Sequence, residues 1–70
     1  MRSFEFRTGE LEDRSIEYLL IDLDSIVSIQ RVTVSADMGY RTKWFVSLAN
    51  GPGYFVTEAG FNRLVQSWKA

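Results

Sequence analysis

YRTKWFVSLANGPGYFV, residues 40–56, decides the fold because it reads as two strands joined by a tight reversal. Apolar and polar side chains alternate through residues 40–49, so that Trp44, Val46 and Leu48 share one face, as in a half-buried strand. Residues 50–53 read Asn-Gly-Pro-Gly, and neither glycine nor proline favours continuing a strand. We therefore expect a hairpin that returns through a short strand at residues 54–56.

The segment that follows, residues 58–69, is predicted to be an amphipathic helix. Its apolar side chains recur at the spacing i, i+3, i+4 and i+7, which places them in one stripe. They are Phe61, Leu64, Val65 and Trp68. Thr57 precedes the helix and is expected to cap it. Gly60 weakens the helix but lets it approach the sheet closely.

Upstream, residues 2–7 alternate as a strand that buries Phe4 and Phe6 on one face. Residues 8–15 are predicted to be a polar loop whose carboxylates form a solvated acidic tip, and these are Glu10, Glu12 and Asp13. Residues 16–23 are apolar at both odd and even positions, so we expect a strand buried on both sides. In a domain this small, the second buried face belongs to a further layer or to another subunit.

The third strand, residues 26–34, changes its apolar phase, because Val27 and Ile29 are odd-numbered while Val32 and Val34 are even-numbered. A shift of one residue moves side chains to the opposite face. We interpret the change as a β-bulge or bend near residues 30 and 31, followed by a turn at residues 35–39.

Together these segments predict an α+β fold: a small, mostly antiparallel, curled β-sheet of about five strands, forming a roll or a partly open barrel, with one C-terminal amphipathic helix. Residues 1–70 are expected to form a single domain. Residues 21–29, residues 46–51 and the closing helix loosely resemble FlbD-type small flagellar proteins and other compact β-rolls. The resemblance includes no diagnostic residue, and it implies no function.

The 70 residues include no cysteine and no histidine. This excludes serine or cysteine triads with histidine, the usual zinc sites and thiol redox chemistry. We expect no cofactor and no catalytic residue. Asp22 and Asp24 are two residues apart and could bind one Mg²⁺ or Ca²⁺ in a carboxylate-based enzyme, but a corner whose aspartates accept from backbone N–H groups is the favoured interpretation, so no metal is expected.

The net charge is −1, and the charges are unevenly distributed. Residues 1–24 hold seven carboxylates and three arginines, whereas residues 25–70 hold five cations and two carboxylates. Arg31, Arg41 and Lys43, flanked by aromatic residues, suggest an alternative function as a single-stranded nucleic-acid binder. Since no segment has the roughly 20 apolar residues needed to span a bilayer, we expect no membrane partner and a cytoplasmic protein.

Aromatic residues make up 14% of this short chain, more than one small core can bury. Aromatic side chains that remain outside the core commonly mark interfaces. The leading hypothesis is therefore a non-enzymatic interaction module that forms a homo-oligomer or binds a protein partner. The candidate interaction surface consists of Tyr18, Leu19, Ile21, Tyr40, Phe45 and Tyr54.

Overall fold

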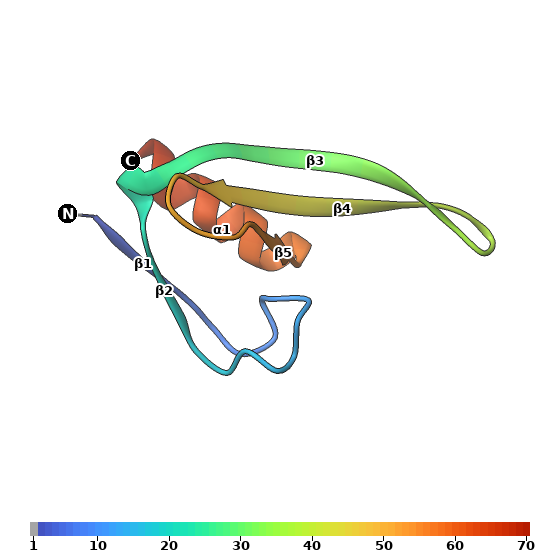
Figure 1. The fold of residues 1–70 in the computed structure, drawn as a ribbon, viewed down its shortest axis with the longest axis horizontal. Coiled ribbons are helices and arrows are strands. Elements are labelled where there is room, and N and C mark those ends of the chain that lie inside the picture. Colours follow the sequence, from blue (N-terminus) through green and yellow to red (C-terminus); the bar gives the residue numbers. More distant parts are fainter. Residues whose placement is uncertain (1) are drawn as a thin grey trace.

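The computed structural model describes residues 2–70 and contains five strands and one α-helix (Figure 1). In chain order the elements are β1 (Ser3–Phe6), β2 (Leu19–Asp22), a 3₁₀ turn η1 (Leu23–Ser25), β3 (Ile26–Ala36), β4 (Gly39–Leu48), β5 (Tyr54–Val56) and α1 (Glu58–Lys69). All strand pairs are antiparallel. The predicted small α+β fold with a C-terminal helix is confirmed. The strands form two sheets, β1-β2 and β3-β4-β5, and neither closes into a barrel.

The hydrophobic core lies where α1 and the β1-β2 pair meet one face of the three-stranded sheet (Figure 1). Val46, Val56 and Leu64 are completely or almost completely buried, and they come from β4, β5 and α1 respectively. The other buried apolar residues are Phe4, Phe6, Leu11, Ile21 and Leu23. The helix begins as predicted, because the Thr57 hydroxyl accepts a hydrogen bond of 3.2 Å from the N–H of Gly60.

The second strand differs from its prediction in length and in burial. It spans only Leu19–Asp22, and its neighbour in the sheet is β1. Ile21 points into the core opposite Phe4, whereas Leu20 is 51% exposed and Tyr18, just before the strand, is 60% exposed. Burial on both sides is therefore wrong for this chain, because a two-stranded sheet with one face on the core leaves its other face in solvent.

The third strand is longer than predicted, and its irregularity lies elsewhere. The β3-β4 register shifts between Ile26 and Ser28 and then runs without interruption to Ala36. A bulge near residues 30 and 31 is therefore wrong. The apolar phase changes because β3 leaves the core: Ile29 lies on the face of buried Val46, while half-buried Val32 lies on the opposite face, outside the core.

The loop between β1 and β2 is fixed to the helix by one buried carboxylate. Glu10 is only 8% exposed, so the predicted solvated acidic tip is wrong at this position. Its two oxygens accept hydrogen bonds from Arg63 of α1, from Nε at 2.9 Å and from Nη2 at 2.7 Å. Oε1 also accepts from the backbone N–H of Arg7 at 2.6 Å. The Arg63 hydrogen bonds lower the pKa of Glu10, and Glu10 raises the pKa of Arg63.

Gly60 marks the contact between the helix and this loop. A Cβ atom placed on Gly60 would lie 2.9 Å from both the Cβ and the carbonyl oxygen of Glu10. The close approach expected from the sequence is present, but the neighbour is the loop and not the sheet. The carbonyl of Glu10 also accepts a 2.8 Å hydrogen bond from the N–H of Thr57, so the loop packs directly on the start of α1.

Replacing Glu10 by glutamine should lower the free energy of unfolding at pH 7 by roughly 1–3 kcal/mol, because the partly buried Arg63 guanidinium loses its counterion. Because folding lowers the pKa of Glu10, its stabilisation is present above the ordinary value of 4.5 and is lost as the pH falls through the lower folded value. The difference between the two proteins should therefore shrink below that pH. Urea unfolding at several pH values measures it, with Glu17→Gln at an exposed position as the control.

Replacing Gly60 by alanine should destabilise the protein, although alanine favours an isolated helix by about 1 kcal/mol. The added methyl group meets backbone and Cβ atoms of Glu10, which cannot move aside as a flexible side chain could. Thermal unfolding tests this, with Asn62→Ala at an exposed position of the same helix as the control. A rise in the unfolding midpoint for Gly60→Ala would contradict the close packing of loop and helix.

Candidate functional site

The most conspicuous feature of the surface is a hairpin that extends beyond the rest of the protein (Figure 1). β5 pairs with β4 only at Trp44, Phe45 and Val46, so residues 31–43 continue as a two-stranded ribbon, which we call the arm. The longest dimension of the molecule is 42 Å, compared with 23 and 22 Å for the other two. All buried core residues lie outside the arm. The arm is therefore not needed to build the core.

The sequence of the arm explains why it forms a ribbon. β-Branched residues, which favour strands, alternate with polar ones, and Thr33 lies directly opposite Thr42. The two strands are joined at Asp37 and Met38, and Gly39 follows with a φ of 121°, a value that glycine adopts without strain. A two-stranded hairpin is marginally stable in water by itself. The arm thus depends on the body at its base and on any contact made along its length.

The two faces of the arm differ in chemistry. On the helix-side face, Arg31, Thr33 and Ser35 of β3 and Tyr40 and Thr42 of β4 lie on the same side as Trp44. The ring of Trp44 lies 6.3 Å from that of Phe61 in α1, which identifies this side. The open face carries two pairs, in which an aliphatic side chain of β3 lies opposite a cation of β4. They are Val32 with Lys43 and Val34 with Arg41.

The three cations of the nucleic-acid hypothesis do not share one face. Arg41 and Lys43 lie on the open face, while Arg31 lies on the helix-side face opposite Trp44. Lys43 is also engaged: its Nζ is 3.3 Å from a carboxylate oxygen of Glu12 and 5.2 Å from the centre of the Phe55 ring. Each face of the arm therefore presents a smaller basic patch than the sequence suggested.

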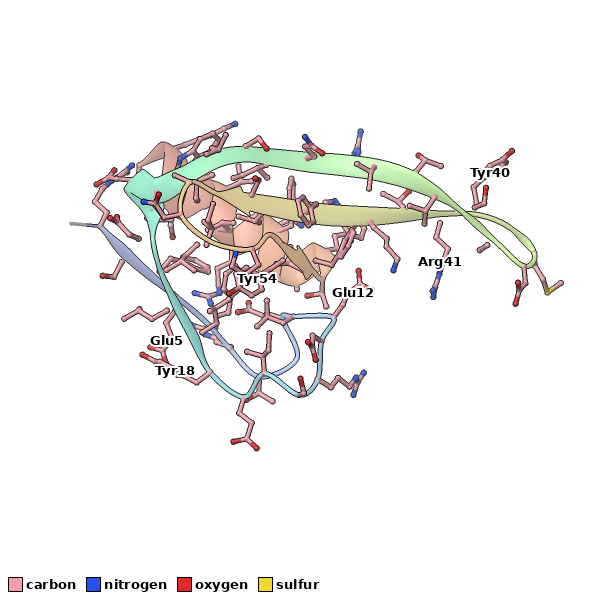
Figure 2. The ribbon with its side chains drawn as sticks, in the orientation of Figure 1. Glu5, Glu12, Tyr18, Tyr40, Arg41 and Tyr54 are labelled. Carbon is pink, nitrogen blue, oxygen red and sulfur yellow. The ribbon has the colours of Figure 1, made fainter. Side chains whose placement is uncertain are left out.

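The six residues of the candidate interaction surface are also dispersed (Figure 2). Tyr40 is 79% exposed near the tip of the arm, and Tyr18 is exposed beside β2, far from it. Ile21 is buried in the core and cannot contact a partner. Leu19 and Tyr54 are half-buried against the core. Phe45 is half-buried on the opposite face of the sheet, where its ring lies over Gly53 and 4.8 Å from the ring of Phe55.

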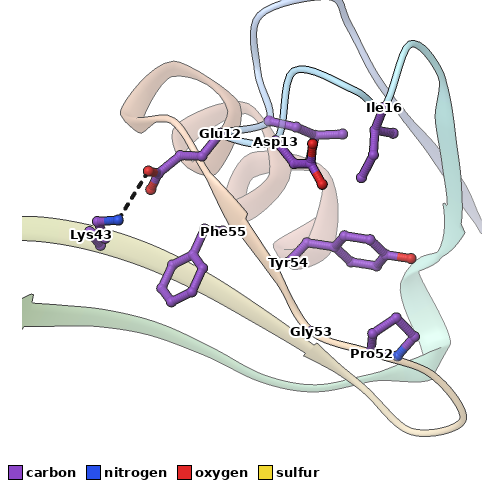
Figure 3. Close-up of a pocket in the computed structure, with 9 residues that line it drawn as sticks. Glu12, Asp13, Ile16, Lys43, Pro52, Gly53, Tyr54 and Phe55 are labelled. Carbon is purple, nitrogen blue, oxygen red and sulfur yellow. Dashed lines mark ion pairs between the residues drawn. The ribbon is translucent and has the colours of Figure 1, made fainter.

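An open groove of about 550 Å³ lies between the β1-β2 loop and β5 (Figure 3). The ion pair between Lys43 and Glu12 closes one end, and Ile16 and Tyr54 contribute apolar surface. The remaining lining residues are Leu11, Asp13, Pro52, Gly53 and Phe55. The carboxylate of Asp13 accepts hydrogen bonds from the N–H and the hydroxyl of Ser15. The groove is thus mainly an apolar depression with internally paired carboxylates.

Asp22 and Asp24, the candidate metal ligands, make structural contacts. Asp22 accepts a hydrogen bond from the N–H of Asp24, which confirms the favoured corner, and Asp24 is paired with Arg2 at 3.1 Å. Within residues 2–70, no three acidic side chains gather closely enough to hold a metal ion. The pKa of Glu10 is lowered by Arg63 and that of Asp13 by Ser15, whereas a general acid at neutral pH needs a raised value.

No protein-family model matches this chain, and neither the curated proteins nor the solved structures include one that matches it. Over residues 2–70, α1 is too short and too polar to cross a lipid bilayer. Function must therefore be inferred from the geometry of the surface.

The centre of the β3 half of the arm consists of Val32, Thr33 and Val34. These residues were not among the candidates from the sequence. The change of apolar phase between Ile29 and Val32 was the available signal, because it marks the point where the strand leaves the core. The scarcity of charge in β3 was a second signal, with Arg31 as its one ionic side chain.

Shortening the arm should leave the body folded. Replacing residues 33–42 with Asn-Gly preserves the Val32–Lys43 pair and closes it with a favourable two-residue turn. Because the core lies outside the arm, we expect the thermal midpoint to change by only a few degrees, corresponding to roughly 1 kcal/mol or less. Circular dichroism during heating measures this, and loss of cooperative unfolding would contradict the separation of arm and body.

Proposed function

We propose that this protein is a non-enzymatic interaction and oligomerisation module that binds through its arm. The supporting observation is that residues 31–43 form an ordered ribbon whose side chains are outside the core. Ordering this ribbon costs conformational entropy. The ribbon contributes no side chain to the core, and a two-stranded hairpin is only marginally stable alone. A binding partner compensates for that cost.

The composition of the arm suits a protein surface as its partner. Its open face combines aliphatic side chains with cations, Tyr40 is 79% exposed, and Met38 at the tip is 99% exposed. Exposed aromatic and methionine side chains beside arginine are enriched at protein interfaces. A second exposed apolar site, Tyr18 with Leu20, lies at β2, away from the arm.

Single-stranded nucleic acid remains the alternative partner, with less support. The basic residues are divided between two faces, and Lys43 is paired with Glu12. Fluorescence anisotropy with labelled oligonucleotides at low salt separates the two functions. We expect little binding, and a strong, salt-sensitive affinity that falls on replacing Arg41 by alanine would favour the alternative.

Light scattering after size exclusion tests the proposed function. At high micromolar concentration the complete chain should exceed its monomer mass of 8.1 kDa, and the fraction associated should rise with concentration. The variant with residues 33–42 replaced by Asn-Gly should remain monomeric. A strict monomer for the complete chain would contradict self-association. Equal association of both proteins would instead assign the interface to the Tyr18 and Leu20 region, which Leu20→Ser would then disrupt.

A further inference from the structure

We propose that the arm pairs with the arm of a second copy of this chain, β3 against β3, antiparallel, about a two-fold axis that passes beside Thr33. This inference rests on the proposed function and names its partner and its contact surface. It extends each three-stranded sheet into one continuous six-stranded sheet.

The first observation is that β3 is an edge strand along its whole length. In the described chain its pairing partner is β4, and it lies at the end of the strand order β3-β4-β5 (Figure 1). β3 has 11 residues, so a row of backbone N–H and C=O groups faces outward. Such a row is a template for another strand.

The second observation is that this edge lacks the usual protection against pairing. Natural edge strands carry charges, proline, bulges or a cover. From Ser28 to Ala36 the register with β4 is continuous, the sequence contains no proline, and Arg31 is the one charged residue. Within the arm, by contrast, the free edge of β4 spans residues 39–43 and carries Arg41 and Lys43. The β3 edge is therefore the better site for strand addition.

The third observation is that β3 is self-complementary. A two-fold axis perpendicular to the sheet places each residue of one copy opposite a residue of the other, and the two residue numbers always add up to the same even number. The open face of one copy then continues into the open face of the other. An axis beside Thr33 pairs Thr33 with its own copy and Val32 with Val34 of the second copy. It also places Arg31 opposite Ser35 of the second copy, so no like charges meet. Threonine and β-branched pairs are favourable cross-strand neighbours.

Neighbouring registers are less favourable. An axis beside Arg31 would place two guanidinium groups directly opposite each other, which destabilises the pair. An axis beside Val32 would place polar Gln30 opposite Val34 of the second copy. With the axis beside Thr33, the valines form one aliphatic stripe along the middle of the open face. The Arg41 and Lys43 side chains of the two copies then lie about 14 Å apart, on the outer β4 strands, where salt screens their repulsion.

Disulfide trapping tests the register, and the chain is suited to it because it has no native cysteine. Thr33→Cys should place two thiols on directly opposed residues, whose Cα atoms are roughly 4.5–5.5 Å apart, within the range of a disulfide. Oxidised glutathione, which takes up the two electrons and two protons, should convert most of this variant to a covalent dimer. Thr42→Cys is the matched control, because Thr42 lies opposite Thr33 on β4, one strand away from the interface.

Charge repulsion tests the same contact without a covalent bond. Thr33→Lys places two ammonium groups opposite each other and should raise the dissociation constant of the dimer roughly tenfold. Thr42→Lys adds the same charge to the same exposed face, but on β4, and should change that constant little. Analytical ultracentrifugation over a concentration series measures both constants, and circular dichroism verifies that both variants remain folded.

The outcomes distinguish this inference from the proposed function. If the unmodified chain is monomeric, both this pairing and the self-association of the proposed function fail. If it associates but Thr33→Cys traps no more dimer than Thr42→Cys, pairing through β3 fails while the interaction module stands. Efficient trapping by Val32→Cys in place of Thr33→Cys would overturn the register. Trapping by Thr33→Cys, together with selective weakening by Thr33→Lys, supports the pairing in full.

Discussion

The ion pair between Glu10 and Arg63 is the contact on which the remaining structure depends. It joins the β1-β2 loop to α1 across 53 positions of the sequence, and the same carboxylate also fixes the N–H of Arg7. The carbonyl of Glu10 in turn accepts from Thr57 where the helix begins, and Gly60 leaves room for that approach. One carboxylate thus orients the small sheet relative to the helix, and the helix covers one face of the larger sheet.

This arrangement divides the chain into a body with a small core and an arm without one. A protein of this length buries only about 60% of its unfolded surface, so few apolar residues are available for stabilisation. Yet residues 31–43 of β3 and β4 form a ribbon that lies outside the core. We propose that the arm serves to contact a partner. Its unprotected edge, its aliphatic stripe and its exposed tip residues all favour a strand or a protein surface over a small molecule.

Local patterns in the sequence predicted the fold well. The hairpin at residues 50–53, the strand whose Trp44, Val46 and Leu48 share one face and the helix with its Thr57 cap follow from period, turn chemistry and capping, which act over a few residues. The errors involve contacts distant in sequence. No local pattern indicates that Glu10 meets Arg63, so its burial was missed. The phase change before Val32 was visible, but a bulge and a strand leaving the core give the same pattern until the extent of the core is known. Ile21 was included in the candidate interaction surface for the same reason, because its burial depends on the packing of the whole body.

Amide hydrogen exchange as a function of protein concentration tests pairing through the β3 edge most directly. Alternate N–H groups of β3 point away from β4 and should exchange rapidly in the monomer. As the chain associates, protection should rise at these outward amides of residues 30–36, while exchange near Tyr18 and Leu20 stays unchanged. Outward amides that remain fast at concentrations where the chain is associated would contradict pairing of the β3 edges.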